Sequence, residues 1–232
     1  MSHDKSSPDF LYHHFYDVDQ QYETSKLGMW AFILTEVLTF GALFVAYTIY
    51  RAWNPDMFIG ANLLLDVNKG LLNTIVLIGS SLTMALAIWA IQLKKKKLSL
   101  IMLFITLICA AMFLGIKYLE YEHKFHLGQL PGEYYSYMGP EVVQEIHDQE
   151  KIDYYIETNN TFFDQETNRL YTMNNPHIFF SIYFIMTGLH GLHVAIGMGL
   201  IAWLMVLTAR GKLHSRYYTH MELVGIFWHL VD

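Results

Sequence analysis

The chain has 232 residues, of which 53% are hydrophobic and 16% are charged, and its formal net charge is −6. The negative balance disfavours a nucleic-acid partner, and the single cysteine, Cys109, excludes an internal disulfide and a metal site of four thiolates. The hydrophobic residues lie in long uninterrupted blocks, whereas a soluble domain would distribute them along a core. The composition therefore predicts an all-α polytopic membrane protein.

In chain order, a polar tail precedes five apolar segments, and a long polar insert separates the third segment from the fourth. A membrane-spanning helix needs about 20 apolar residues, and the first four segments reach this length at 27–50, 71–93, 98–118 and 177–207. The fifth begins at Met221. The 14 residues from Thr219 cover only about 21 Å of a core roughly 30 Å thick, so we expect the chain to continue beyond Asp232.

These boundaries predict four regions along the chain. They are a polar tail at 1–25, spans one to three within 26–123, the insert at 124–176, and spans four and five within 177–232. We also expect residues 51–70 to form a loop, because Pro55, Gly60 and Gly70 interrupt the apolar pattern.

Positive charge in the short connections predicts the orientation in the membrane. A run of four lysines follows the second span, and a basic turn with Arg210, Lys212 and Arg216 follows the fourth. Cytoplasmic loops carry an excess of such residues, so both connections and the N-terminal tail are expected on the cytoplasmic side. The insert then lies on the opposite side.

The insert is acidic and rich in aromatic residues. Between residues 124 and 175 there are nine acidic and three basic residues, a surplus equal to the net charge of the whole chain. A solvated loop explains this pattern, and so does a surface that attracts a basic soluble partner. The tyrosines and phenylalanines between the acids favour packing over disorder.

Glu36 is an acidic residue near the middle of the first predicted span. An ionisable group at that depth is costly and is a candidate for function. Two interpretations are open. In the first, the carboxyl has a function, either in proton uptake or in contact with a lipid. In the second, it is a neutral acid that only forms a hydrogen bond between helices.

The fourth span carries two histidines, His190 and His193, on nearly one face. Metal or haem ligation would need further ligands, and His229 in the last segment is another histidine well inside an apolar run; hydrogen bonding between helices is the alternative. Glu222 and His229 are seven residues apart and share a helix face. Small residues that would let another helix approach closely recur every four positions, at Thr187, Gly191, Ala195 and Gly199.

Several stretches resemble subunit III of haem–copper respiratory oxidases. The matching segments appear in family order: MWAFILTEVLTFGALFVAY (29–47), LLNTIVLIGSSLTMALA (71–87), YLEYEHKF (118–125), TGLHGLHVAIG (187–197) and ELVGIFWHLVD (222–232). The resemblance implies a non-catalytic subunit without redox centres that packs against catalytic subunit I, which holds the haems and copper. It also implies bound structural phospholipid and support of proton uptake. Residues that match the family motifs are Glu36, His190, His193, Glu222, Trp228, His229 and Asp232.

The chain departs from the common seven-helix form, because two helices that precede the Glu36 helix there are missing and the insert is unusually long. We therefore predict subunit III, in a five-helix form, of a proton-pumping cytochrome c oxidase in the bacterial cytoplasmic membrane, with cytochrome c near the acidic insert. The alternatives are an accessory subunit of a nitric oxide reductase or of a quinol oxidase. A b-type haem membrane protein that uses His190 or His193 with His229 is a third.

Overall fold

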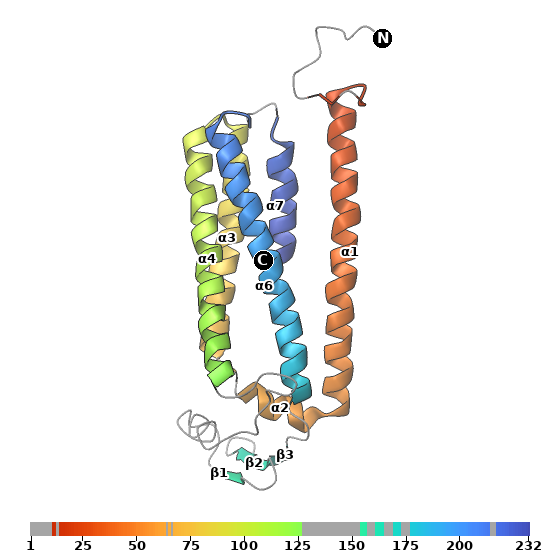
Figure 1. Ribbon diagram of the computed structural model, residues 1–232, viewed down its shortest axis with the longest axis vertical. Coiled ribbons are helices and arrows are strands. Elements are labelled where there is room, and N and C mark those ends of the chain that lie inside the picture. Colours follow the sequence, from red (N-terminus) through yellow and green to blue (C-terminus); the bar gives the residue numbers. More distant parts are fainter. Residues whose placement is uncertain are drawn as a thin grey trace. The chain divides into compact units, whose positions relative to one another are not determined.

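The computed structural model describes the backbone at 11–12, 14–63, 65, 67–126, 154–156, 161–164, 169–172, 177–213 and 217–232. Within these ranges, four helices are long and apolar enough to cross a membrane. They are α1 (Val18–Trp53), α3 (Val67–Gln92), α4 (Lys96–His126) and α6 (His177–Ala209), drawn from orange to blue in Figure 1. Four of the five predicted spans are thus present as helices, as expected for a multi-pass membrane protein.

Helix α1 begins before the predicted span. The polar residues from Val18 onward were expected in the tail, but the structure places them in the helix. The side chain of Asp17 caps this end, because its Oδ1 accepts a hydrogen bond of 2.6 Å from the backbone N–H of Gln20. No proline or glycine occurs between Val18 and Gly28, so the helix extends beyond the apolar stretch on this side.

The prediction of a loop at 51–70 was wrong, because a short helix, α2, spans Pro55–Leu63. Pro55 is the first residue of this helix. Proline at that position fits well, since its missing N–H would have no partner in the helix anyway and its φ angle suits the first turn. The proline therefore starts a helix here instead of interrupting one.

The helix ends in the two basic turns take the left-handed backbone conformation. Lys94 has a φ of 60° directly after α3, where the N–H of Lys95 donates to the carbonyl of Ala90 at 2.9 Å. Gly211 has a φ of 75° after α6, and the N–H of Lys212 donates to the carbonyl of Leu207 at 3.0 Å. Both turns satisfy carbonyls that the helix end leaves unpaired.

Three short strands lie within the predicted insert, a feature that the all-α prediction did not include. They are β1 (Tyr154–Ile156), β2 (Thr161–Asp164) and β3 (Arg169–Thr172), and they form an antiparallel sheet in the order β1-β2-β3 (Figure 1). Their aromatic and β-branched residues favour strands, and β3 contacts α2. Most of the acidic residues of the insert lie outside the described residues.

The last helix, α7, spans Thr219–Val231 and has 13 residues. It covers about 20 Å, which is less than the roughly 30 Å of a hydrocarbon core. The fifth crossing therefore stays a prediction.

The chain divides into two compact units, each of which takes one part of every long helix. The first comprises Met1–Leu38, Val76–Met112 and His193–Asp232, and the second comprises Thr39–Ile75 and Phe113–Leu192. Buried apolar residues of the first unit include Met84, Ala87, Ile91, Leu103, Ile201, Leu204, Met221 and Trp228. Those of the second include Met57, Phe58, Ala61, Phe113, Phe179 and Phe180.

Candidate functional site

Two of the predicted site residues form a pair in the first unit. Glu36 lies near the middle of α1, and its Oε2 is 2.9 Å from Nε2 of His193 on α6. Only 16% of the Glu36 side chain and 12% of the His193 side chain are exposed. A buried carboxyl and a buried imidazole satisfy each other's hydrogen-bonding needs, which lowers the cost of placing either in an apolar environment.

His190 has a different environment, although it is only three residues from His193. It lies in the second unit, where its ring packs edge-to-face on Phe113 at 5.3 Å between ring centres and an angle of 89°. From the sequence, the two histidines were interpreted together because they lie on nearly one helix face. The structure gives each its own neighbours.

Glu222 and His229 share α7 but have separate partners. The hydroxyl of Tyr22 on α1 donates to Oε2 of Glu222 at 2.5 Å. Nδ1 of His229 lies 2.7 Å from the hydroxyl of Ser81 on α3. The two predicted residues thus link α7 to two different helices and do not form a joint site.

A buried polar network that the sequence did not reveal lies beside His229. Nε1 of Trp228 donates to the hydroxyl of Ser80 at 3.1 Å, and that hydroxyl lies 2.9 Å from Oδ2 of Asp232. Trp228 and Ser80 are both fully buried. Trp228 and Asp232 belong to a motif that the resemblance singled out. The adjacent serines Ser80 and Ser81, in the middle of a predicted span, were the available signal for their partner.

The predicted ladder of small residues includes positions that another helix could approach, but a glycine of α6 outside the ladder makes a closer contact. A Cβ on Gly199 would meet nothing within 4 Å, Ala195 is exposed, and a Cβ on Gly191 would meet only Leu114 at 3.9 Å. At Gly197, a Cβ would lie 2.8 Å from ring atoms of Trp228. Gly197 is therefore a position on α6 where a larger side chain would overlap a ring of α7, while a role for the ladder toward a partner stays a prediction.

A second group of polar residues lies in the second unit, at the end of α4. Nζ of Lys117 is 2.8 Å from Oε2 of Glu120, and the hydroxyl of Tyr183 on α6 donates to the other oxygen of this carboxylate. Lys124 is 4% exposed and lies over the ring of Tyr183, 5.4 Å from its centre. The group fixes α4 against α6 by charge-assisted hydrogen bonds.

Thr187, the first residue of the ladder, belongs to the same region. Its hydroxyl forms a hydrogen bond with the hydroxyl of Tyr121. A cavity of about 140 Å³ lies beside it, lined by Tyr47, Leu65, Phe179, Tyr183, Met186 and Thr187. The small size and the mostly apolar lining suit packing of a hydrocarbon segment better than a reaction.

No group of three or more histidine, cysteine, aspartate or glutamate side chains with the placement of a metal site was found among the described residues. In the described ranges, the site that the geometry does define is a buried carboxyl–imidazole pair between two helices of a multi-pass membrane protein. Such a pair can hold and position a proton, and it offers no nucleophile or metal-ligand set for a reaction.

The family model for cytochrome c oxidase subunit III matches residues 7–129, just over half of the chain, so the chain belongs to the cytochrome c oxidase subunit III family. Membership implies association with other subunits of a haem–copper oxidase. The matched region includes Glu36 and three of the five stretches that carry the resemblance, 29–47, 71–87 and 118–125.

Similar proteins carry oxidase names of more than one kind. A "Heme-copper oxidase subunit I+III" of Aeropyrum pernix is 27% identical over 218 residues, which is 89% of this chain and 21% of that protein. A "Probable quinol oxidase subunit 3" of Staphylococcus saprophyticus is 25% identical over 234 residues, which is 100% of this chain and 90% of that protein. The protein of the same name in Staphylococcus aureus is also 25% identical, over 236 residues.

Proposed function

We propose that this chain is the non-catalytic subunit III of a haem–copper oxygen reductase in a bacterial cytoplasmic membrane. It packs against the catalytic subunit, which holds the haems and copper, and has no redox centre of its own. It supports assembly of the complex, binds structural phospholipid and assists proton uptake while the catalytic subunit reduces O2 to water. The family match supports the assignment to subunit III.

The Glu36–His193 pair carries the proposal that the subunit assists proton uptake. With one proton between them, the two groups are neutral as a pair, either as a hydrogen-bonded acid and base or as an ion pair. An arrangement of this kind can stay inside an apolar span at low cost and still exchange its proton. The contact distance of 2.9 Å permits both forms.

The test replaces each partner in the complete complex. Glu36→Gln is expected to leave assembly intact, because the amide has nearly the same shape and can still form a hydrogen bond with His193. It should slow proton uptake or shorten the active lifetime during prolonged turnover. His193→Gln should have the same effect, and the double variant should cost little more than either single one, because the partners act together.

Glu23→Gln provides a matched control, since Glu23 is an exposed acid on the same helix. Proton uptake and inactivation are followed in vesicles that contain the purified complex. Wild-type behaviour of Glu36→Gln throughout prolonged turnover would leave the pair with a packing role only.

The proposal also concerns the electron donor of the complex. The acidic insert led us to expect cytochrome c, whereas the names of the Staphylococcus proteins favour quinol for this chain. We propose quinol on this ground. Oxygen uptake by the purified complex with a reduced quinol and, separately, with reduced cytochrome c distinguishes the two donors.

The remaining alternatives have separate tests. An accessory subunit of a nitric oxide reductase would copurify with that reductase and would support no oxygen uptake. A b-type haem protein would show a Soret band in the isolated chain. The contacts of His193 with Glu36 and of His229 with Ser81 favour hydrogen bonding over haem ligation.

A further inference from the structure

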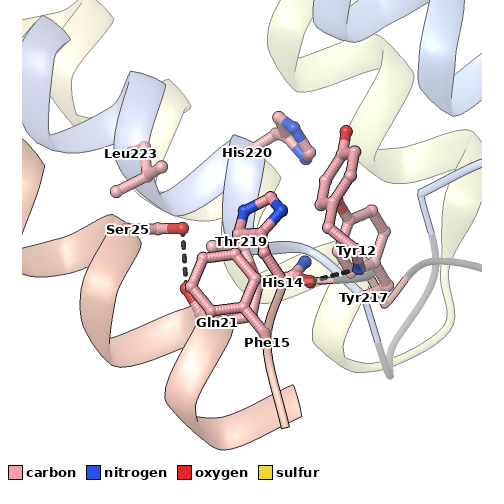
Figure 2. Close-up of a pocket in the computed structure, with 9 residues that line it drawn as sticks. All are labelled: Tyr12, His14, Phe15, Gln21, Ser25, Tyr217, Thr219, His220 and Leu223. Carbon is pink, nitrogen blue, oxygen red and sulfur yellow. Dashed lines mark hydrogen bonds between the residues drawn. The ribbon is translucent and has the colours of Figure 1, made fainter. Parts of the chain in front are cut away.

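A cavity of about 230 Å³ lies within the first unit, between the start of α1 and the start of α7 (Figure 2). It is distinct from the Glu36–His193 pair and from the Trp228 network. Nine residues line it: Tyr12, His14, Phe15, Gln21, Ser25, Tyr217, Thr219, His220 and Leu223.

The walls of the cavity are held by specific hydrogen bonds. The backbone N–H of Tyr12 donates to Oε1 of Gln21 at 2.9 Å, which folds the segment before α1 back onto the helix (Figure 2). The hydroxyl of Ser25 donates to the carbonyl of Gln21 at 2.8 Å, and Gln21 is only 7% exposed. The Tyr22–Glu222 hydrogen bond joins α1 to α7 next to the cavity.

The lining favours a neutral aromatic ligand. It contains aromatic rings, hydroxyls, an amide and two imidazoles, and none of its nine residues is Lys, Arg, Asp or Glu. A phosphate group would lack a strong cationic partner there. Burial, with the neighbouring Tyr12, raises the pKa of the Tyr217 phenol above its ordinary value, so this hydroxyl stays neutral at physiological pH.

One lining residue has an unused polar atom. His220 packs edge-on against the rings of Trp203 and Tyr217, at 5.4 and 5.3 Å between centres. Its Nδ1 is buried and has no hydrogen-bond partner among the described residues. Buried polar atoms are rarely left in this state, and a hydroxyl group in the cavity would satisfy this nitrogen.

The size of the cavity indicates what part of a ligand it holds. A water molecule takes about 30 Å³ of liquid volume, so the space corresponds to about eight waters. Pockets for whole drug-sized ligands begin near 300 Å³, so this one suits a ring system and not a long amphiphile.

The surface beside the cavity can accept a hydrocarbon tail. On α1, Gly28 lies seven residues after Gln21 and therefore on nearly the same helix face, and a Cβ on Gly28 would meet nothing within 4 Å. Gly28 stands near the start of the apolar stretch of a candidate membrane span. A ring in the cavity could therefore continue into a chain that lies along α1.

We propose that this cavity binds the ring of a membrane quinol, whose hydroxyl donates to Nδ1 of His220 and whose tail lies along α1 past Gly28. The inference rests on the quinol form of the proposed function. It assigns binding only, and no electron transfer to this chain. The reduced form is preferred over the quinone, because a quinone carbonyl offers no proton to an imidazole that acts as acceptor.

The test uses the purified complex and a quinol with a photoreactive diazirine at the base of its tail. Mass spectrometry is expected to map crosslinks to peptides that contain residues 12–30 and 217–227. Unlabelled quinol should compete for the site, and the quinol dimethyl ether, which cannot donate a hydrogen bond, should compete about threefold to tenfold less well.

Three variants sharpen the test. His220→Phe keeps a ring against Trp203 and Tyr217 but removes the acceptor, so crosslinking should fall about threefold to tenfold. Leu223→Trp fills the cavity and should abolish crosslinking. Leu27→Trp makes the same exchange at an exposed position on another face of α1 and should leave crosslinking unchanged. The haem content of each preparation shows whether the complex has assembled, and the His220→Phe result decides if Leu223→Trp fails to assemble.

Crosslinks that survive in both cavity variants, or that phosphatidylglycerol removes as well as quinol does, would overturn the inference. Oxygen uptake with quinol is measured in the same preparation. Quinol-dependent uptake without crosslinks to this chain would refute the cavity while the proposed function stands. Crosslinks without quinol-dependent uptake would support the cavity and refute quinol as the donor.

Discussion

At the scale of single residues, the contact between Gly197 and Trp228 sets how closely α7 approaches α6. A side chain at position 197 would overlap a ring that is fully buried and cannot move without breaking its hydrogen bond to Ser80. We predict that Gly197→Ala destabilises the chain by about 1–3 kcal/mol, the usual cost of overpacking. The measurement is the unfolding midpoint in detergent.

Gly199 is the matched control, because it lies two residues away on the same helix and faces open space. Gly199→Ala should leave the midpoint unchanged or raise it slightly in the isolated chain, because alanine favours a helix more than glycine does. Equal losses from both substitutions would show that the contact with Trp228 is not responsible.

The residues of the candidate site could be predicted from the sequence, but their pairing could not. Glu36 and His193 were each predicted from their burial in an apolar span, but they are 157 residues apart and no local pattern joins them. No pattern in the sequence indicated that His190 and His193 would have different neighbours. Pairing of this kind depends on how the helices are rotated against each other, which helical spacing alone does not determine.

At the scale of elements, the turn between α3 and α4 contains a strained residue. Lys94 has a left-handed backbone at φ 60°, a conformation that costs an L-residue with a side chain about 1–2 kcal/mol. Lys94→Gly is therefore expected to raise stability by up to about 1 kcal/mol, since glycine adopts this conformation without strain although it adds entropy to the unfolded chain.

Lys95→Gly is the comparison for that variant, because it removes the same charge at a position without a positive φ. It should be neutral or slightly destabilising. The two unfolding midpoints, measured in the same detergent, should thus move apart. A common shift would mean that the loss of positive charge determines the result.

Helices and strands could be predicted from the sequence only where a long run of apolar residues marks them. The four long spans follow from apolar runs. The turn expected at the four lysines is present at Lys94 and Lys95, whereas Lys96 and Lys97 already belong to α4. Helix α2 was missed because Pro55 was interpreted as an interruption, although it begins a helix. The strands were missed because they lie in a segment dominated by charge, where short aromatic runs such as Tyr154–Ile156 are a weak signal.

At the scale of the whole molecule, the orientation in the membrane is a separate prediction. One candidate span, α3, separates Asn54 from Lys95, so the two positions should face opposite sides. In a Cys109→Ala background, an impermeant thiol reagent should label Asn54→Cys in intact spheroplasts and Lys95→Cys only after the membrane is opened. The reverse pattern would contradict the cytoplasmic placement of the basic turns.

This chain is proposed to work beside a redox subunit and to bind no metal itself. The direct measurement is affinity purification of the chain from its native membrane in mild detergent, with absorption spectra and metal analysis before and after the subunits are separated. We expect haem and copper in the complex, in the fraction with the catalytic subunit, and none in this chain. A Soret band or copper that stays with the isolated chain, or a chain that purifies alone, would contradict the account.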